Sequence, residues 1–109
     1  MSAAKRKGTA WETEIVRYLQ EQGLAARRVV QMGRLDQGDI HVEEDWVLEA
    51  KNVKSIDLAD FVRQALREAR NAGREYGAAV VKRRNSNVSN GYVITDLETF
   101  ARIIKALTR

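Results

Sequence analysis

Apolar residues recur at helical intervals near the start of the chain. Trp11, Ile15 and Leu19 are spaced four residues apart, so they share one face of a helix. Thr9 precedes Glu12 by three residues, which is the spacing of a capping box at a helix N-terminus. The pattern predicts a helix over residues 10–22, closed by a glycine and preceded by a short basic tail over residues 1–8.

Two later stretches show the same helical period. Asp57 is placed to cap the first of them. The expected buried stripe of this helix comprises Leu58, Phe61, Val62, Ala65, Leu66, Ala69 and Ala72. The second stretch opens with Thr95 and Glu98, which repeat the capping-box spacing. Its expected inward positions are Leu97, Phe100, Ala101, Ile104 and Leu107.

Shorter apolar runs between these helices predict strands. Residues 39–42 and 46–53 alternate apolar and polar side chains around an acidic turn at 43–45, which favours a β-hairpin. The other expected strands are 25–31, 78–82 and 92–94, and the expected loops are 32–38 and 82–91. The order of helix, three strands, helix, one or two strands and helix predicts an α/β fold with a mixed sheet flanked by helices. A chain of 109 residues has room for one domain, over residues 1–109.

Composition narrows the chemistry. The chain has no cysteine and one histidine, His41, which excludes disulfides, thiolate zinc sites and histidine-rich metal sites. His41 is expected to be an ordinary strand residue, and Trp11 and Trp46 to belong to the core. Without a long apolar run or a readable signal peptide, the protein is expected to be cytoplasmic, neither secreted nor in a membrane. The net charge of +4 favours a polyanionic partner.

The candidate chemistry lies on the predicted hairpin. Glu49 and Lys51 are two residues apart on one strand, so they project from the same face. A turn at 43–45 pairs Asp39 with Glu49, at roughly 4.5–5.5 Å between the backbones. Two carboxylates so close repel unless a cation lies between them, and Mg²⁺, with Mn²⁺ as a substitute, is suited to such a site. Lys51 is then placed to orient the attacking water or to neutralise charge developing on a phosphate.

Glu12 is a further candidate acid. It precedes Ile15 and Val16 by three and four residues, so it borders the packed stripe of its helix and can lean over the sheet edge as a metal or water ligand. The capping box gives the same side chain a purely structural role, and the two roles are compatible.

These residues resemble a known family, the PD-(D/E)XK nuclease superfamily, and within it the archaeal-type Holliday junction resolvases. The resemblance covers roughly residues 5–81 and rests on Lys7-Gly8-Thr9-Ala10-Trp11-Glu12, Asp39 and Glu49-Ala50-Lys51. It implies a restriction-endonuclease-like fold with an αβββαβ core. It also implies metal ligands at Glu12, Asp39 and Glu49, with Lys51 as the catalytic lysine. Gly38 stands where the family name has proline, and Gln31-Met32-Gly33-Arg34 lacks the serine usual in these resolvases.

Basic residues gather at the start of the chain, on the second helix and in the loop at 82–91. On the second helix, four arginines recur at spacings of four, three and four residues and form a ridge: Arg63, Arg67, Arg70 and Arg74. Glu68 and Glu75 interleave with this ridge, so an exposed face with local ion pairs is the alternative. The candidate DNA-binding residues are Lys5, Arg6, Lys7, Arg34, Arg63, Arg67, Arg70, Lys82, Arg83 and Arg84. Gln64 on the same helix resembles a helix glutamine of some exonuclease relatives.

Residues and resemblance together predict a metal-dependent DNA endonuclease that cleaves branched DNA, of the Holliday junction resolvase type, acting in recombination and repair. The alternatives are another restriction-like or nicking endonuclease of the superfamily, or a non-catalytic DNA-binding module that retains the fold. Resolution of a four-way junction needs two nicks related by two-fold symmetry, so the active species is expected to be a homodimer, with the last helix as a candidate contact.

Overall fold

The computed structural model describes residues 3–108, with side chains from Arg6 onward. The elements in chain order are α1 (Ala3–Glu21), β1 (Ala26–Arg28), β2 (Ile40–Val42), β3 (Trp46–Lys51), α2 (Leu58–Asn71), β4 (Tyr76–Val81), the 3-10 helix η1 (Val88–Asn90), β5 (Tyr92–Ile94) and α3 (Leu97–Leu107). The strands form one sheet in the order β1-β2-β3-β4-β5, in which β3 and β4 are parallel and the other neighbours antiparallel. The predicted α/β fold with a mixed sheet is therefore confirmed.

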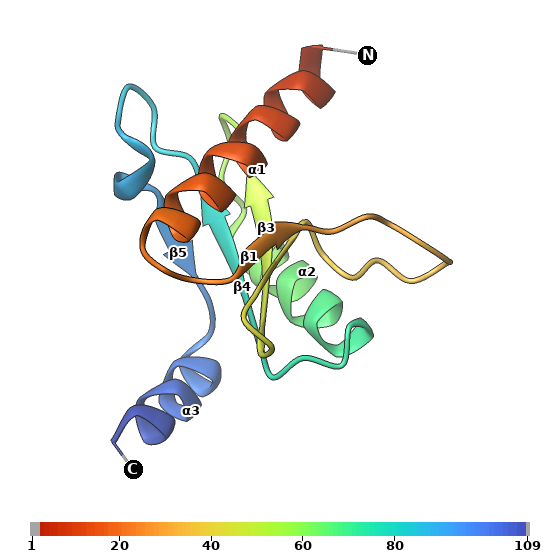
Figure 1. The fold of residues 1–109 in the computed structure, drawn as a ribbon, viewed down its shortest axis with the longest axis vertical. Helices are drawn as coiled ribbons and strands as arrows, with labels where there is room; N and C mark the ends of the chain where they lie inside the picture. Colours follow the sequence, from red (N-terminus) through yellow and green to blue (C-terminus); the bar gives the residue numbers. More distant parts are fainter. Residues whose placement is uncertain (1–2, 109) are drawn as a thin grey trace.

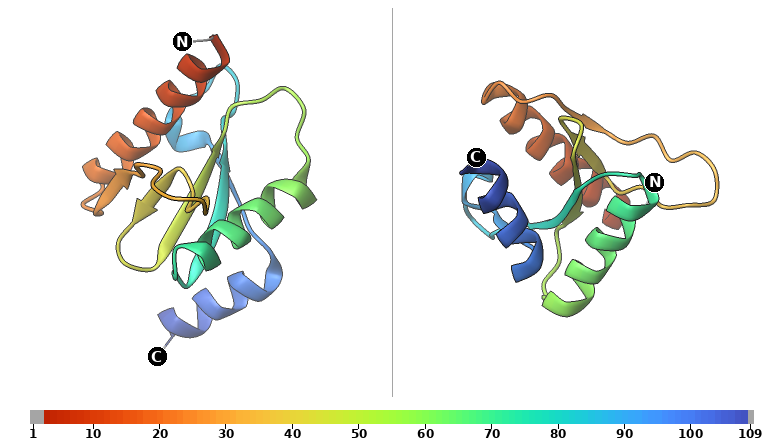
Figure 2. Two further views of the ribbon diagram at one scale, coloured as in Figure 1. Left: turned by 90° about the vertical axis from the view of Figure 1, so that its right-hand side faces the viewer. Right: turned by 90° about the horizontal axis from the view of Figure 1, so that it is seen from below.

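The two longer helices cover opposite faces of the sheet. α1 lies on one face and α2, which connects β3 to β4, lies on the other, while α3 lies beyond the end of the sheet at which β4 begins (Figure 1; Figure 2). None of the helices in the described part of the chain is long and apolar enough to cross a bilayer.

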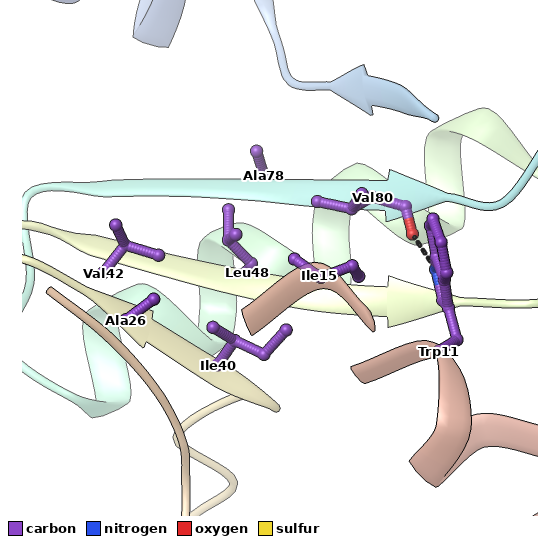
Figure 3. Close-up of a cluster of buried hydrophobic side chains, with 8 residues drawn as sticks. All are labelled: Trp11, Ile15, Ala26, Ile40, Val42, Leu48, Ala78 and Val80. Carbon is purple, nitrogen blue, oxygen red and sulfur yellow. Dashed lines mark hydrogen bonds between the residues drawn. The ribbon is translucent and has the colours of Figure 1, made fainter. Parts of the chain in front are cut away.

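The main core lies between α1 and the sheet. Trp11 is 1% exposed, and its indole Nε1 donates a hydrogen bond to the carbonyl oxygen of Val80 at 3.1 Å (Figure 3). Trp46 and Ala50, which share a face of β3, pack partly buried against the same cluster. The cluster comprises Trp11, Ile15, Ala26, Ile40, Val42, Leu48, Ala78 and Val80. Both tryptophans thus have the structural role expected of them.

The predicted hairpin register is confirmed. Val42 pairs with Trp46 and Ile40 with Leu48, so β2 and β3 are joined by the turn at residues 43–45. Asp39 precedes β2, and its backbone N–H donates to the carbonyl oxygen of Leu48 at 3.2 Å. The same alternation places Val47, Glu49 and Lys51 on the face of β3 opposite to Leu48, toward α2.

The predicted start of the first helix is wrong. α1 begins at Ala3, so described residues of the expected tail are helical, while residues 1 and 2 lie outside the described part. Alanine, lysine and arginine are strong helix formers, which explains the extension through this basic segment. Thr9 lies inside the helix, where its carbonyl oxygen accepts a bond from the Thr13 hydroxyl at 2.9 Å. The capping box read from Thr9 and Glu12 therefore does not form.

The edge strand β1 is shorter than predicted. It ends at Arg28, and Val30, expected near its end, is 78% exposed. Only the first residue of this strand, Ala26, belongs to the core. Beyond β1 the chain leaves the sheet edge in the loop at residues 31–38 (Figure 1).

α2 has a small core of its own. Its N-cap is Asp57, as predicted, whose side chain accepts from the Asp60 N–H at 3.1 Å. Phe61 packs with Ala79 and Val81, and with the half-buried Ile94. The close approach of α2 to β4 requires Gly77, because a Cβ there would lie 2.5 Å from the carbonyl oxygen of Ala65. Leu58, expected in the buried stripe, is exposed, since it starts the helix beyond the sheet.

α3 differs most from its prediction. The N-cap is Asp96, whose side chain accepts from the Thr99 N–H at 2.9 Å, while the Thr95 hydroxyl donates to the carbonyl oxygen of Gly77. Thr99 is buried and Arg102 binds Glu75 at 2.8 Å, so the polar side of the helix faces the body. The positions expected to face inward are instead exposed: Leu97, Phe100, Ala101, Ile104 and Leu107.

Candidate active site

The candidate acids and Lys51 meet at one end of the sheet. Glu49 and Lys51 lie among the last three residues of β3, and Asp39 lies just before β2, which runs antiparallel beside β3. The N-terminal end of α1 and the loops after β3 and β4 lie at this same end (Figure 1). The parallel pair β3 and β4 therefore ends beside the acidic residues, and loops from several parts of the chain surround them.

The hairpin holds Asp39 against Glu49. One carboxylate oxygen of Asp39, Oδ2, accepts from the backbone N–H of Ala50 at 2.9 Å. Its carboxyl group lies within hydrogen-bonding reach of Glu49, and burial together with that neighbour raises the pKa of Asp39 to about 8. The register inferred from the turn is therefore enough to bring these two acids together.

A third acid, Glu68 of α2, completes a buried row. Burial raises the pKa of Glu49 to about 8, with Glu68 and its charge contributing in the same direction. Burial also raises the pKa of Glu68 to about 7. Carboxylate oxygens of Asp36, Glu49 and Glu68 all lie within 4.8 Å of one another. The face of the sheet under α2 thus holds several acids where the other face holds a hydrocarbon core.

Lys51 is positioned by α2. Its Nζ donates to Oε1 of Gln64 at 2.9 Å and lies 5.0 Å from the centre of the Phe61 ring. Gln64 is itself oriented, because its amide nitrogen donates to Oδ2 of Asp60 at 2.7 Å. A chain of hydrogen bonds along one turn of α2 therefore sets the place of the lysine ammonium group.

Glu12 lies near the hairpin acids but has a basic partner. Its Oε1 accepts from Nε of Arg28 at 3.1 Å. Burial raises the pKa of Glu12, and the charge of Asp39 raises it further, while Arg28 lowers it. The charge of Asp39 therefore acts on Glu12, and both residues are outside the group of three acids, Asp36, Glu49 and Glu68, whose oxygens lie within 4.8 Å of one another.

The acids fit a hard divalent cation better than they fit a solvated acidic surface. Glu49 is 7% exposed and Glu68 is 1% exposed, and within the described chain no salt bridge to either is formed. Buried carboxylates without cationic partners are costly, and oxygen ligands of this kind are those that Mg²⁺ and Mn²⁺ bind. Asp39 and Glu49 would hold the cation, with Glu12 or water beyond them.

The candidate DNA-binding residues fall into three groups in space. Arg63, Arg67 and Arg70 are exposed on α2, although Arg63 also pairs with Asp60 at 3.1 Å. Arg34 is exposed on the loop at 31–38. The third group lies at the end of the sheet that carries the site, and its exposed members are Arg6, Lys7, Arg83 and Arg84. Lys5 belongs to α1, but its side chain is outside the described part.

Two basic residues make contacts within the molecule. Lys82 binds Glu14 at 3.4 Å and lies 5.5 Å from the centre of the Trp11 ring. Arg74, which continues the spacing of the arginine ridge, donates to the carbonyl oxygens of Glu43 and Trp46 and so ties α2 to the hairpin. The ridge on α2 therefore ends at Arg70.

His41 is satisfied by its neighbours. It is buried in β2, its Nε2 lies 2.8 Å from the carbonyl oxygen of Gln37, and its Nδ1 lies 3.3 Å from Nη2 of Arg27. Burial lowers its pKa, so the ring stays neutral at physiological pH. The expectation of an ordinary strand residue agrees with these contacts.

Sequence reasoning missed Glu68 and Asp36. Its spacing from the arginines predicts that Glu68 pairs with the ridge, but it faces the sheet, and Glu75 pairs with Arg102 of α3 and not locally. A usable signal was present, since Glu68 follows Phe61 by seven residues and Ala65 by three, which puts it on the buried stripe.

Comparison with known proteins supports the fold. No protein-family model matches this chain, and no curated protein matches it in sequence. A solved structure is similar to it: Hjc, a Holliday junction resolvase from the archaeal hyperthermophile Archaeoglobus fulgidus, which is 24% identical to this chain. The match covers 87% of this chain and 93% of that one, with a TM-score of 0.56. The two chains share a fold. The fold expected from the resemblance to archaeal resolvases is therefore confirmed.

Proposed function

We propose that this protein is a metal-dependent DNA endonuclease that cleaves branched DNA, of the Holliday junction resolvase type. The observation that carries the proposal is the carboxyl pair of the partly buried Asp39 and the buried Glu49 beside Lys51, at the end of a strand where exposed basic segments gather. The fold shared with an archaeal Holliday junction resolvase supports the same assignment. Mg²⁺ is the proposed cofactor, with Mn²⁺ as a substitute.

The chain's own residues would divide the work of phosphodiester hydrolysis. At such a site a divalent cation supplies charge neutralisation at the phosphate and activation of water. Asp39 and Glu49 would hold such a cation in their ionised forms, which their raised pKa values disfavour in the absence of positive charge. Lys51, held by Gln64, adds a fixed positive charge where negative charge develops on the phosphate oxygens.

DNA would be bound through its backbone. The exposed arginines of α2 and the basic residues at the ends of α1 and β4 flank the site on different sides. Contacts of this kind orient the duplex arms and carry no sequence information, which suits an enzyme that recognises a branched shape.

A homodimer is proposed as the active species. The five exposed apolar positions of α3 form a face that the described body does not cover. An apolar hollow of about 250 Å³ lies between α1 and the sheet, lined by Leu19, Leu24, Val42, Trp46, Leu48 and Val93. A second copy that covers these surfaces would supply the second site needed for paired nicks in a four-way junction.

One assay tests the proposal and its alternatives. A labelled four-way junction is incubated with the protein and Mg²⁺, beside linear, nicked and flap substrates of the same sequence. Cleavage that prefers the junction and disappears with EDTA is the expected result. Preference for another substrate would favour a different endonuclease of the superfamily. Binding without cleavage in either Mg²⁺ or Mn²⁺ would favour a non-catalytic DNA-binding module.

A further inference from the structure

The least expected side chain in the molecule is Glu68. It lies in the buried stripe of α2, next to Ala69 and one turn after Ala65, and is 1% exposed. Its Oε1 has no hydrogen-bond partner within the described residues. A buried carboxylate oxygen without a partner destabilises a fold, and a residue such as leucine would fill the same place at lower cost. Stability of the folded chain therefore does not account for this residue.

The surroundings of Glu68 supply oxygen ligands. Glu49 reaches it from β3 and Asp36 from the loop at 31–38, and all three offer oxygens within 4.8 Å of one another. Oxygens bound to one Mg²⁺ are separated by roughly 3–4 Å, as follows from octahedral geometry with bonds near 2.1 Å. Only a small contraction separates the three acids from such a shell.

The loop that carries Asp36 is held in place. Oδ1 of Asp36 accepts from the Gly38 N–H at 2.9 Å, and its carbonyl oxygen accepts from the Asn71 side chain at 2.8 Å. Gly38 lies beside α2, where a Cβ on it would be 3.6 Å from Oε1 of Glu68. The loop is thus held by a bond within itself and by the bond from Asn71 of α2.

We propose that Asp36, Glu49 and Glu68 bind a divalent cation of their own, beside the cation assigned to Asp39 and Glu49. Glu49 is shared by the two positions. The inference rests on the proposed function for the use of the cation, but the binding itself is testable without any substrate. It assigns Glu68 and Asp36 as ligands, whereas the resemblance to resolvases assigns only Glu12, Asp39 and Glu49.

The test counts ions in the full-length chain without DNA. Mn²⁺ is titrated into EDTA-free protein, and the free ion is measured by its electron paramagnetic resonance signal. The wild type is expected to bind two Mn²⁺ per chain, and Glu68→Gln and Asp36→Asn to bind one. Asp39→Asn should also bind one, at the position that it does not disturb. Glu44→Gln, which removes an exposed acid of the hairpin turn, is the matched control and should bind two.

The outcomes separate this inference from the proposed function. A wild type that binds one ion, or Glu68→Gln and Asp36→Asn variants that both keep two, would overturn the inference even if the protein cleaves junctions. Two ions with no cleavage of any substrate would leave the inference standing and overturn the proposed function. If Glu68→Gln fails to fold by circular dichroism, Asp36→Asn decides alone, because Asp36 is exposed.

Discussion

Leu48 and Glu49 are neighbours on β3, and each is 7% exposed, yet their side chains lie on opposite faces of the sheet. Leu48 points to α1 and joins the hydrophobic core, in which the buried indole N–H of Trp11 donates to the carbonyl oxygen of Val80. Glu49 points to α2 and lies among other acids with raised pKa values. One face of the strand packs in a hydrocarbon core, and the other holds several acids close together where the proposed chemistry takes place.

The largest effect is expected from the acids on the α2 face. Asp39→Asn and Glu49→Gln should each lower junction cleavage roughly a thousand-fold or more, because each removes a charge that holds the cation. The metal-free melting temperature should stay unchanged or rise, since repulsion among buried acids is relieved. Cleavage by Asp39→Asn at the wild-type rate would show that the active site is elsewhere.

The opposite result is expected one residue away. Leu48→Ala should lower the free energy of unfolding by about 3 kcal/mol, because it leaves a cavity in the core under α1. Urea denaturation measures this loss. Junction cleavage, measured well below the melting temperature, should stay within a few-fold of the wild type. A stable Leu48→Ala variant with no cleavage would mean that the two faces are not independent.

The acids should make the metal-free protein less stable as pH rises. The pKa values of Asp39 and Glu49 are about 8 in the folded chain, far above the ordinary range of carboxyl groups. Between about pH 5 and 8 the folded state therefore holds protons that the unfolded state has lost. The free energy of unfolding then falls by about 1.4 kcal/mol per pH unit for each such proton.

Urea denaturation in EDTA at pH 5.5 and 8.5 checks this pH dependence. Glu68→Gln should make it less steep, because the substitution removes an acid whose pKa is raised to about 7. Saturating Mg²⁺ should restore stability at the higher pH. Equal stability at both pH values without metal would contradict the raised pKa values.

The exposed arginines of α2 should contribute to DNA binding, and Arg17 of α1 should not. Replacement of Arg63, Arg67 and Arg70 by alanine should lower the slope of log affinity against log salt by about 2–3 units, if each arginine neutralises a phosphate. Arg17→Ala, an exposed change on α1, should leave the slope unchanged. Fluorescence anisotropy with a cleavage-inactive variant measures both. An unchanged slope in the triple variant would assign DNA binding to the basic residues at the start of α1 and in the loop after β4.

The smallest effect is expected at Gln64. Gln64→Ala removes the acceptor that holds Lys51, so kcat should fall about tenfold while KM changes little. Arg67→Ala, on the exposed side of the same helix, should leave kcat within twofold when DNA is saturating. A loss in the Gln64 variant that appears only in KM would indicate a role in DNA binding.

Much of the α1 face and of the hairpin could be predicted from sequence, because both depend on local pattern. A three-residue turn and strict alternation are enough to pair Asp39 with Glu49. The helical spacing of Trp11 and Ile15 likewise predicts a packed face. The placement of Asp36 depends on how the loop at 31–38 folds back toward α2, and no local pattern determines that.

The ends of the chain show a second limit. Capping signals from Thr9 and Thr95 had the right spacing, but helix propensity extended α1 beyond the first, and Asp96 capped α3 instead of the second. The apolar stripe of α3 predicts an amphipathic helix correctly, but not what covers it. A single sequence does not show whether an apolar helix face is buried within its own chain or against another chain.

The conformation of Gly38 limits which residues can replace it during evolution. Its φ is +92°, and a Cβ at this position would clash with the Val47 side chain. Proline, which stands at this place in the motif that the sequence resembles, holds φ near −65°. Proline at this position would therefore require both the loop at 31–38 and β3 to change their conformation. A sequence pattern that demands proline before the aspartate therefore does not match a chain with this loop.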